Sequence, residues 1–464
     1  MGEIERVMND QYRVESDLLG EIEVPLEALY GAQTQRAVLN FPVGNQRTIG
    51  SFPAFITGLL HIKHAAALAN LEAGHLTKDI AKAICAAVET VEKGDPKAYF
   101  PIHALHGGGG TSANMNANEV LANIGEELLG GKRGDYRLIH PNDHVNLNQS
   151  TNDVIPAACH MGVILKWREV RKSVEDLIAS VDACAIQHRN QRRIARTCLQ
   201  DAVLISFADL FGGYSAFLKR SLNRIDGSVE KLHAVPIGGT IVGRLDDVSP
   251  GYFERVIPAL RKVTGNEAYR RSDNLFDAAQ NMDDMIDVSG QLDLFARGMI
   301  KICKDLRLMN SGPETGFCEI SLPAVQPGSS IMPGKINPVM PEFVIQLSFK
   351  ICGNDEACRM ALDHGELDLN VWESIVTFSL LESMELAESA AAALSTRCFS
   401  GLVVHRDRND RNVGTIIPLL TELMKQHGYS AVSDVCKQAG GDSVRLRSLL
   451  SERFGSCCDQ HVDS

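Results

Sequence analysis

The chain has 464 residues, and its 46 Lys and Arg against 58 Asp and Glu give a formal net charge of −12. The apolar fraction of 44% is ordinary for a globular protein and excludes an intrinsically disordered chain. The length predicts two or three domains. The acidic balance argues against a general nucleic-acid partner, because such a protein needs a basic face to displace counterions.

The sequence also indicates a compartment. No apolar run reaches about 18 residues, so we expect no membrane partner, and the acidic N-terminus lacks the apolar segment of a secretory signal. Most of the twelve cysteines stand singly in apolar runs, which favours reduced thiols in a cytoplasmic protein. Cys457, Cys458 and His461 have the residue types of a metal site, but their terminal position favours exposed thiols and no metal.

Composition divides the chain into three predicted domains. Residues 1–148 mix short predicted helices with Gly- and Asn-rich loops. Residues 149–402 form a central domain of long helices, and residues 403–464 form a small helical C-terminal domain that begins with the polar run HRDRNDRN.

Apolar residues recur every three or four positions in the central domain and predict long helices. Their ranges are about 155–188, 203–233, 277–308, 341–364 and 371–398. A helix of 30 residues is about 45 Å long, so these rods predict an elongated bundle. The last range is apolar on more than one face. This favours a bundle completed by other copies of the chain over a central helix in a monomer.

The first polar segment is HGGGGTSANMNANE at residues 106–119. Four successive glycines before Thr111 leave the backbone free to expose N–H groups at the start of a helix, where an anion can bind. A flexible turn with an Asn-rich cap is the alternative interpretation.

The second polar segment is HPNDHVNLNQSTNDVIP at residues 140–156. Ser150, Thr151 and Asn152 precede the first long helix and offer neutral hydrogen bonds to a carboxylate. An elaborate helix cap explains the same residues.

The third polar segment is AVQPGSSIMPGKINPVMPE at residues 324–342. Its prolines and glycines exclude a regular helix, and long loops in compact domains are usually functional or disordered. One lysine, two serines and an asparagine indicate anion capture by a mobile lid. A smaller segment, ARTCLQDAV, places Thr197 and Cys198 at a predicted helix junction, where nothing intrinsic marks a site.

Together these segments resemble the aspartase/fumarase superfamily. GSSIMPGKINP is similar to its G-S-S-x-M-P-x-K-x-N loop, which falls at residues 327–338 here. GGTSANMNANEVLAN, HPNDHVN-x-x-QSTND and ARTCLQDAV are similar to its other active-site regions, in the same order. The resemblance covers about residues 13–440. It implies an all-α, three-domain subunit whose long helices form a twenty-helix core in a homotetramer, with each active site shared by three subunits.

The chemistry that the resemblance implies is reversible β-elimination from a small dicarboxylate or amino-acid substrate, without metal or organic cofactor. A base removes a proton next to one carboxylate, and the resulting aci-carboxylate needs preorganised donors. Ser329 matches the base, a role that needs a strongly depressed hydroxyl pKa. The other implied roles are contact with the aci-carboxylate by Thr111, Ser150, Thr151 and Ser330, contact with the second carboxylate by Thr197, Lys335 and Asn337, contact with the leaving group by Asn152, and orientation of Lys335 by Glu342.

NPVMPE, FKICGND and LDLNVWES are similar to aspartate ammonia-lyases, whereas class II fumarases more often read NPTQ-x-E. Class II fumarases also carry a histidine where this chain has Cys198, close to the leaving group. We therefore expect elimination of ammonia from L-aspartate to give fumarate. A lyase for a modified aspartate or another C4-dicarboxylate, a class II fumarase and a non-catalytic structural member stay open. Arg244 departs from the aspartase pattern and is interpreted as a salt-bridge residue rather than a substrate ligand.

Overall fold

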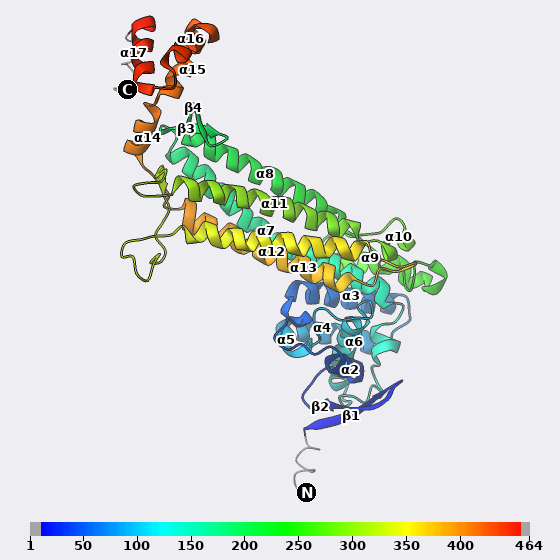
Figure 1. Ribbon diagram of the computed structural model, residues 1–464. Coiled ribbons are helices and arrows are strands. Elements are labelled where there is room, and N and C mark those ends of the chain that lie inside the picture. Colours follow the sequence, from blue (N-terminus) through cyan, green and yellow to red (C-terminus); the bar gives the residue numbers. More distant parts are fainter. Residues whose placement is uncertain (1–10, 456–464) are drawn as a thin grey trace. The chain divides into compact units, whose positions relative to one another are not determined.

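The computed structural model describes residues 11–455, and helices dominate it (Figure 1), which confirms the all-α class. The chain divides into two compact units. The first unit comprises the chain up to Lys172, Leu222–Ala296 and Phe349–Glu388. The second unit comprises Ser173–Ser221, Arg297–Ser348 and the chain from Ser389. Each long central helix is divided between the units, and the three-domain division stays a prediction.

The N-terminal part of the first unit contains longer helices than its sequence predicts. Its elements are β1 (Tyr12–Asp17), β2 (Gly20–Pro25), α2 (Ala32–Asn40), α3 (Pro53–Glu72), α4 (Lys78–Lys93), α5 (Pro96–Tyr99) and α6 (Thr111–Leu128). Helices α2 and α5 are short, with 9 and 4 residues, but α3, α4 and α6 have 20, 16 and 18 residues, so for these three the prediction of short helices was wrong. Most of α6 is buried, and its packing on several faces stabilises the helix. A helix buried on several faces has only a weak amphipathic pattern, so the sequence did not predict its length.

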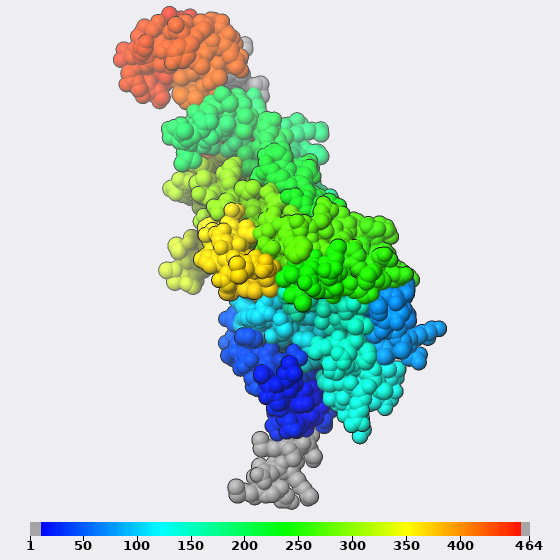
Figure 2. All heavy atoms as spheres, turned by 90° about the vertical axis from the view of Figure 1, so that its right-hand side faces the viewer, coloured from blue at the N-terminus to red at the C-terminus, as the bar shows by residue number. Residues whose placement is uncertain are grey.

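Segments far apart in sequence meet around α6. The buried Glu119 carboxylate accepts the backbone N–H groups of Gly31, Gln33 and Thr34, which begin α2, at 2.8–3.1 Å. Figure 2 shows the blue N-terminal residues beside cyan residues that follow α6, and Arg133 Nη1 donates to Glu27 O at 2.9 Å. The bonds to Glu119 hold the start of α2 against α6, the helix that follows the four glycines before Thr111, here called the glycine loop.

Within residues 11–455, five helices are at least 22 residues long, and their segments in each unit lie side by side (Figure 1). They are α7 (Thr151–Gln187), α8 (Phe207–Lys231), α11 (Asp283–Met309), α12 (Val339–Leu362) and α13 (Glu373–Leu394). Polar contacts join neighbours: Trp167 Nε1 of α7 donates to Asp226 Oδ1 of α8 at 2.8 Å, and Ser289 Oγ of α11 donates to Asp355 Oδ1 of α12 at 2.8 Å. The predicted bundle of long helices is confirmed.

Two predicted helical ranges differ in detail. The range 203–233 begins in strand β4 (Gln200–Ser206), because β-branched residues there pair with β3 (Arg192–Thr197). The range 277–308 is interrupted after α10 (Leu275–Gln280), where Asn281 is extended. Helix α13 ends at Leu394 and continues as the π-helical turn Ser395–Phe399.

The remaining elements are short or C-terminal. In the first unit they are Ile49–Ser51, Pro141–Val145, β5 (Ala234–Val235), Leu245–Asp247, α9 (Pro250–Thr264) and β6 (Arg270–Arg271). In the second unit they are β7 (Ile320–Ser321), β8 (Val403–Val404), α14 (Arg406–Val413), α15 (Ile416–His427), α16 (Tyr429–Ala439) and α17 (Ser443–Phe454). The last three helices share a small core around Leu423, Val432 and Leu450.

No helix within residues 11–455 is both long and apolar enough to cross a membrane. The ten cysteines in that part of the chain are free, which agrees with the prediction of unpaired thiols. Cys457, Cys458 and His461, the residues weighed for a terminal metal site, lie outside the described residues.

Candidate active site

The glycine loop enters α6 through three left-handed residues. Gly108, Gly109 and Gly110 have φ of +88°, +55° and +76°. A Cβ on Gly110 would lie 2.7 Å from Ile155 Cγ2, so this position needs glycine for space as well as for conformation. The turn makes the exposed Thr111 the first residue of α6. Its own N–H donates to Gly108 O at 3.1 Å, and the N–H groups that follow in the first turn lack acceptors within the helix. This arrangement suits an anion.

The start of α7 combines a helix cap with exposed polar groups. Ser150 Oγ accepts the Asn152 N–H at 3.3 Å, and Asp153 Oδ1 accepts the Ser150 N–H at 3.0 Å. This reciprocal pair is a capping box. Asn152 Nδ2 donates to Ile241 O at 2.8 Å. Ser150, Thr151 and Asn152 are only half-buried, so the cap still leaves them open to a ligand.

A buried amide joins these two regions. Asn114, one turn into α6, donates through Nδ2 to Thr151 Oγ1 and to Asn146 Oδ1, both at 3.2 Å. Because Thr151 Oγ1 accepts this bond, its own O–H remains free to donate to a ligand. The bond from Asn114 of α6 therefore leaves the Thr151 hydroxyl as a donor for a ligand.

A buried lysine donates hydrogen bonds to the amide side chains beside Thr151. Lys63 Nζ, on α3, donates to Asn146 Oδ1 at 2.9 Å and to Gln149 Oε1 at 3.0 Å. Burial lowers the Lys63 pKa to about 7, an effect that the Asp153 carboxylate opposes. Burial raises the Asp153 pKa to about 6, against N–H donors from Ser150, Thr240 and Gly238 and the Lys63 charge. Sequence reasoning missed Lys63, although a lysine inside the apolar run GLLHIKHAAALAN was a signal.

The G-S-S-x-M-P-x-K-x-N loop at residues 327–338, here called the signature loop, lies in a segment with no helix or strand between residues 322 and 338, as its prolines and glycines predict. Two bonds close it: the Gly328 N–H donates to Lys335 O at 2.8 Å, and Asn337 Nδ2 donates to Gly328 O at 2.8 Å. Asn337 therefore shapes the loop. Ser330 and Lys335 are exposed, and Ser329 is half-buried.

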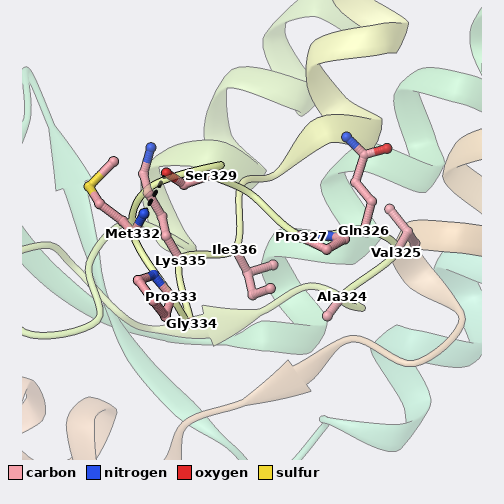
Figure 3. A pocket seen from close by; sticks show the side chains of 10 residues that line it. All are labelled: Ala324, Val325, Gln326, Pro327, Ser329, Met332, Pro333, Gly334, Lys335 and Ile336. Atoms are coloured by element: carbon pink, nitrogen blue, oxygen red, sulfur yellow. Dashed lines mark hydrogen bonds between the residues drawn. The ribbon is translucent and has the colours of Figure 1, made fainter.

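Ser329 lies in a small nest of backbone donors. Its Oγ accepts the N–H of Ile331 at 3.2 Å and of Met332 at 3.0 Å, the second of which is drawn in Figure 3. Ser329 and Lys335 line one pocket of about 490 Å³ (Figure 3). Donors directed at a hydroxyl oxygen favour its ionised form, so this loop has the parts that an alkoxide base needs.

Thr197 and Cys198 lie at a hairpin, not at the predicted helix junction. Thr197 pairs with Gln200, and Cys198 and Leu199 form the two-residue turn between β3 and β4, with φ of +53° and +61°. Such turns usually carry Asn and Gly, so the junction prediction failed because the turn lacks its usual residues. Strained residues of this kind concentrate at functional sites, and both predicted residues are exposed.

Glu319 fixes this hairpin to the base of the signature loop. The carboxylate is fully buried and accepts Arg193 Nη2 at 3.0 Å and Arg196 Nη1, both from β3. Glu319 directly precedes β7, which leads into the loop. The hairpin and the loop thus share one buried ionic contact, which sequence reasoning did not find because the partners are more than 120 residues apart.

Two further predicted residues have other partners. Glu342, in the first turn of α12, accepts Arg307 Nη2 at 3.3 Å, so its orientation of Lys335 stays a prediction. Arg244 is exposed and pairs with Asp247 at 2.5 Å, as expected of a salt-bridge residue.

The predicted residues fall into two groups. Thr111, Ser150, Thr151 and Asn152 belong to the first unit. The others, which belong to the second unit, are Thr197, Cys198, Ser329, Ser330, Lys335, Asn337 and Glu342. The described residues that line the pocket at Ser329 include Lys335 but neither Thr197 nor Cys198.

Comparison with known proteins places this geometry in a family. The sequence pattern of the lyase family matches residues 20–353. The aspartate ammonia-lyase of Bacillus subtilis (strain 168) is 39% identical over 437 residues, which cover 94% of this chain and 91% of that protein. The aspartate ammonia-lyase of Escherichia coli (strain K12) is 37% identical over 452 residues, which cover 96% of this chain and 94% of that protein.

Solved structures agree. A Brucella melitensis protein described as fumarate lyase:delta crystallin bound to cobalt has a TM-score of 0.92 at 37% identity, covering 97% of this chain and 98% of that one. A class II fumarase from Schistosoma mansoni has a TM-score of 0.91 at 32% identity, covering 97% of both chains. The fold and the loop define a lyase. The chain belongs to the lyase family of the aspartase/fumarase superfamily, and its similarity to aspartate ammonia-lyases extends over nearly its whole length.

Proposed function

We propose that the protein catalyses reversible β-elimination of ammonia from L-aspartate to give fumarate. The observation that carries this proposal is the similarity to aspartate ammonia-lyases at 37–39% identity over 94–96% of the chain. The donor-lined Ser329 and the polar start of α7 supply the groups that such an elimination requires.

The two carboxylates of the substrate are assigned to two different sets of side chains. The carboxylate that becomes the aci-carboxylate is held by neutral donors: the hydroxyls of Thr111, Ser150, Thr151 and Ser330. The other carboxylate meets Lys335, with Thr197 and Asn337 beside it. Because Asn114 occupies the acceptor side of Thr151, the Thr151 proton points to the substrate. Fixed donors of this kind stabilise charge that develops during reaction.

Proton abstraction is assigned to Ser329. The Ile331 and Met332 N–H groups stabilise its alkoxide, and closure of the signature loop removes water that would compete for it. The alkoxide takes the proton from the carbon next to one carboxylate, and the electrons of that C–H bond form the aci-carboxylate. The C–N bond then breaks, and the protonated amine leaves as ammonia toward Asn152. Residue 198 is a cysteine where class II fumarases carry a histidine, which supports ammonia rather than water as the leaving group.

We further propose that the active site is completed in a homotetramer, with residues from three subunits. The long helices of the first unit expose large apolar side chains, including Leu294 at 47%, Phe349 at 61% and Met360 at 57%. Exposed apolar helix faces favour subunit interfaces. Light scattering on the purified protein tests the tetramer, and a monomer at working concentration would contradict it.

We place the enzyme in the cytoplasm. The free state of the ten described cysteines supports this, because reduced thiols persist in a reducing compartment. Fractionation of expressing cells tests the assignment.

A substrate panel tests the reaction. Purified protein is mixed in turn with L-aspartate, L-malate and argininosuccinate, and fumarate absorbance is followed. Fumarate from aspartate is expected. Fumarate from malate alone would indicate a fumarase, fumarate from argininosuccinate alone would indicate a lyase of a modified aspartate, and no turnover would favour a structural member.

A further inference from the structure

The first unit contains an acidic cavity that the predicted site does not include. It has a volume of about 350 Å³ and lies where α7, α8, α10, α11 and α13 meet. Among the described residues that line it, five carboxylates outnumber two cationic side chains. The acidic residues are Asp273, Asp277, Asp283, Asp284 and Glu373, and the basic residues are Lys231 and Arg270. Lys231 is already paired with Asp287 at 2.8 Å, so the excess charge is negative.

Glu373 is the least satisfied of these carboxylates. It is 2% exposed, and among the described residues its Oε2 has no hydrogen-bond partner. Burial raises the Glu373 pKa to about 7. Glu119 is similarly buried, but its oxygens accept the N–H groups of Gln33 and Thr34. The backbone N–H of Glu373 itself opposes the rise of its pKa, but the described residues give Oε2 no donor, and a bound cation would supply one.

A second acceptor lines the same cavity. His160 Nδ1 lies 3.0 Å from the carbonyl oxygen of Ala234, which can only accept, so Nδ1 carries the proton. Burial lowers the His160 pKa, against the Ala234 and Leu232 carbonyl groups and the Asp284 charge, and so favours the neutral ring. In the tautomer with the proton on Nδ1, Nε2 is an acceptor. Glu373 and the neutral ring of His160 thus line the same cavity, and each carries an acceptor atom.

The cavity adjoins the predicted leaving-group position. Asn152, Pro156 and His160 are four residues apart along α7 and share one face of the helix. Pro156 and His160 line the cavity. The loop before α13 also reaches the glycine loop, because Val371 Cγ1 lies 3.5 Å from the position of a Cβ on Gly109.

We infer that this cavity binds, as ammonium, the ammonia that leaves the substrate. The ammonia takes up one proton from solvent, and Ser329 returns to solvent the proton that it removed from the substrate. The inference rests on the proposed function, because ammonia is the leaving group of that reaction. Ammonium donates up to four hydrogen bonds, and the acceptors of Glu373 and His160 match it. The cavity then takes up the product at the end of the helix face that begins with Asn152.

Thermal unfolding of the purified full-length protein tests the inference. Melting is followed in rising ammonium chloride, with sodium chloride and tetramethylammonium chloride at matched ionic strength. Ammonium alone is expected to raise Tm in a saturable way. Glu373→Gln should increase the half-saturating ammonium concentration about tenfold or more, because a charged hydrogen bond is lost. Glu356→Gln removes an exposed carboxylate from α12 and should leave it unchanged.

Further variants separate the outcomes. If Glu373→Gln does not fold, Asp284→Asn is expected to increase the half-saturating concentration about threefold. An unchanged response in these variants, or a response removed by Asn152→Ala alone, would place ammonium elsewhere and overturn the inference. The same titration is repeated with magnesium chloride at matched ionic strength, and a Glu373-dependent response to magnesium but not to ammonium would also overturn the inference. A Glu373-dependent ammonium response without turnover of aspartate would keep the binding site and refute the proposed reaction.

Discussion

The polar start of α7 and the signature loop are built in opposite ways. At α7, Thr151 and the Ser150 cap rest on Asn114, Asn146 and the buried Lys63, each within hydrogen-bond distance of the next. The signature loop is exposed, and its two closing bonds lie within the loop itself. The difference separates two tasks. A substrate carboxylate needs donors fixed in advance, whereas a base that works only without water belongs on a segment that can close.

The largest effect is expected at the buried lysine. Lys63→Met removes the two buried hydrogen bonds that the ammonium group donates to Asn146 and Gln149, so the free energy of unfolding should fall by about 3–5 kcal/mol. Denaturant unfolding measures the change. Lys166→Met is the matched control, because Lys166 is half-buried and forms ion pairs with Glu169 and Glu388. Its loss should lower the free energy of unfolding by about 1 kcal/mol or less. Equal costs would show that the α7 region is not a buried network.

A pair of glycines extends the comparison, because Gly110, before α6, packs against Ile155 of α7, whereas Gly334 lies in the signature loop. Gly110→Ala combines a left-handed φ of +76° with a contact of 2.7 Å to Ile155, so a loss of about 2–4 kcal/mol is expected. At Gly334 the φ is +83°, but a Cβ would contact no other atom, so Gly334→Ala should lower the free energy of unfolding by about 1 kcal/mol. Denaturant unfolding of both variants checks this. A larger cost at Gly334 would contradict the contrast.

The loop lysine should affect activity rather than stability. Lys335→Met removes a charge-assisted bond to the substrate, so kcat/KM for aspartate should fall about 100-fold. Tm should stay unchanged because Lys335 is exposed. Lys437→Met, on an exposed face of α16, is the control. A loss of Tm with unchanged kcat/KM would assign Lys335 a structural role.

The smallest effect is expected at Arg244. Because the ion pair of Arg244 with Asp247 is exposed, Arg244→Ala should change the free energy of unfolding by about 0.5 kcal/mol or less and leave kcat/KM unchanged. Kinetics with aspartate and with N-substituted aspartates measure it. A loss confined to one substrate would instead make Arg244 a specificity residue.

Much of the fold could be predicted from the sequence, because helical periodicity and proline-rich breaks are local signals. The long helices and the irregular loop at residues 322–338 follow from them. The hairpin at Cys198 could not be predicted, because its turn lacks the usual Asn-Gly pair and is held by the distant Glu319. Lys63 could not be assigned a role, because its partners Asn146 and Gln149 lie more than 80 residues away. Contacts of that range depend on packing, which a single sequence does not display.

The role of Ser329 is the central claim, and one variant tests it most directly. Ser329→Ala removes the oxygen that accepts the Ile331 and Met332 N–H groups. Fumarate formation from aspartate should fall on the order of 10³-fold or more, with Tm and oligomeric state unchanged. Activity within about tenfold of the original protein, at the same Tm, would contradict the assignment of Ser329 as the base.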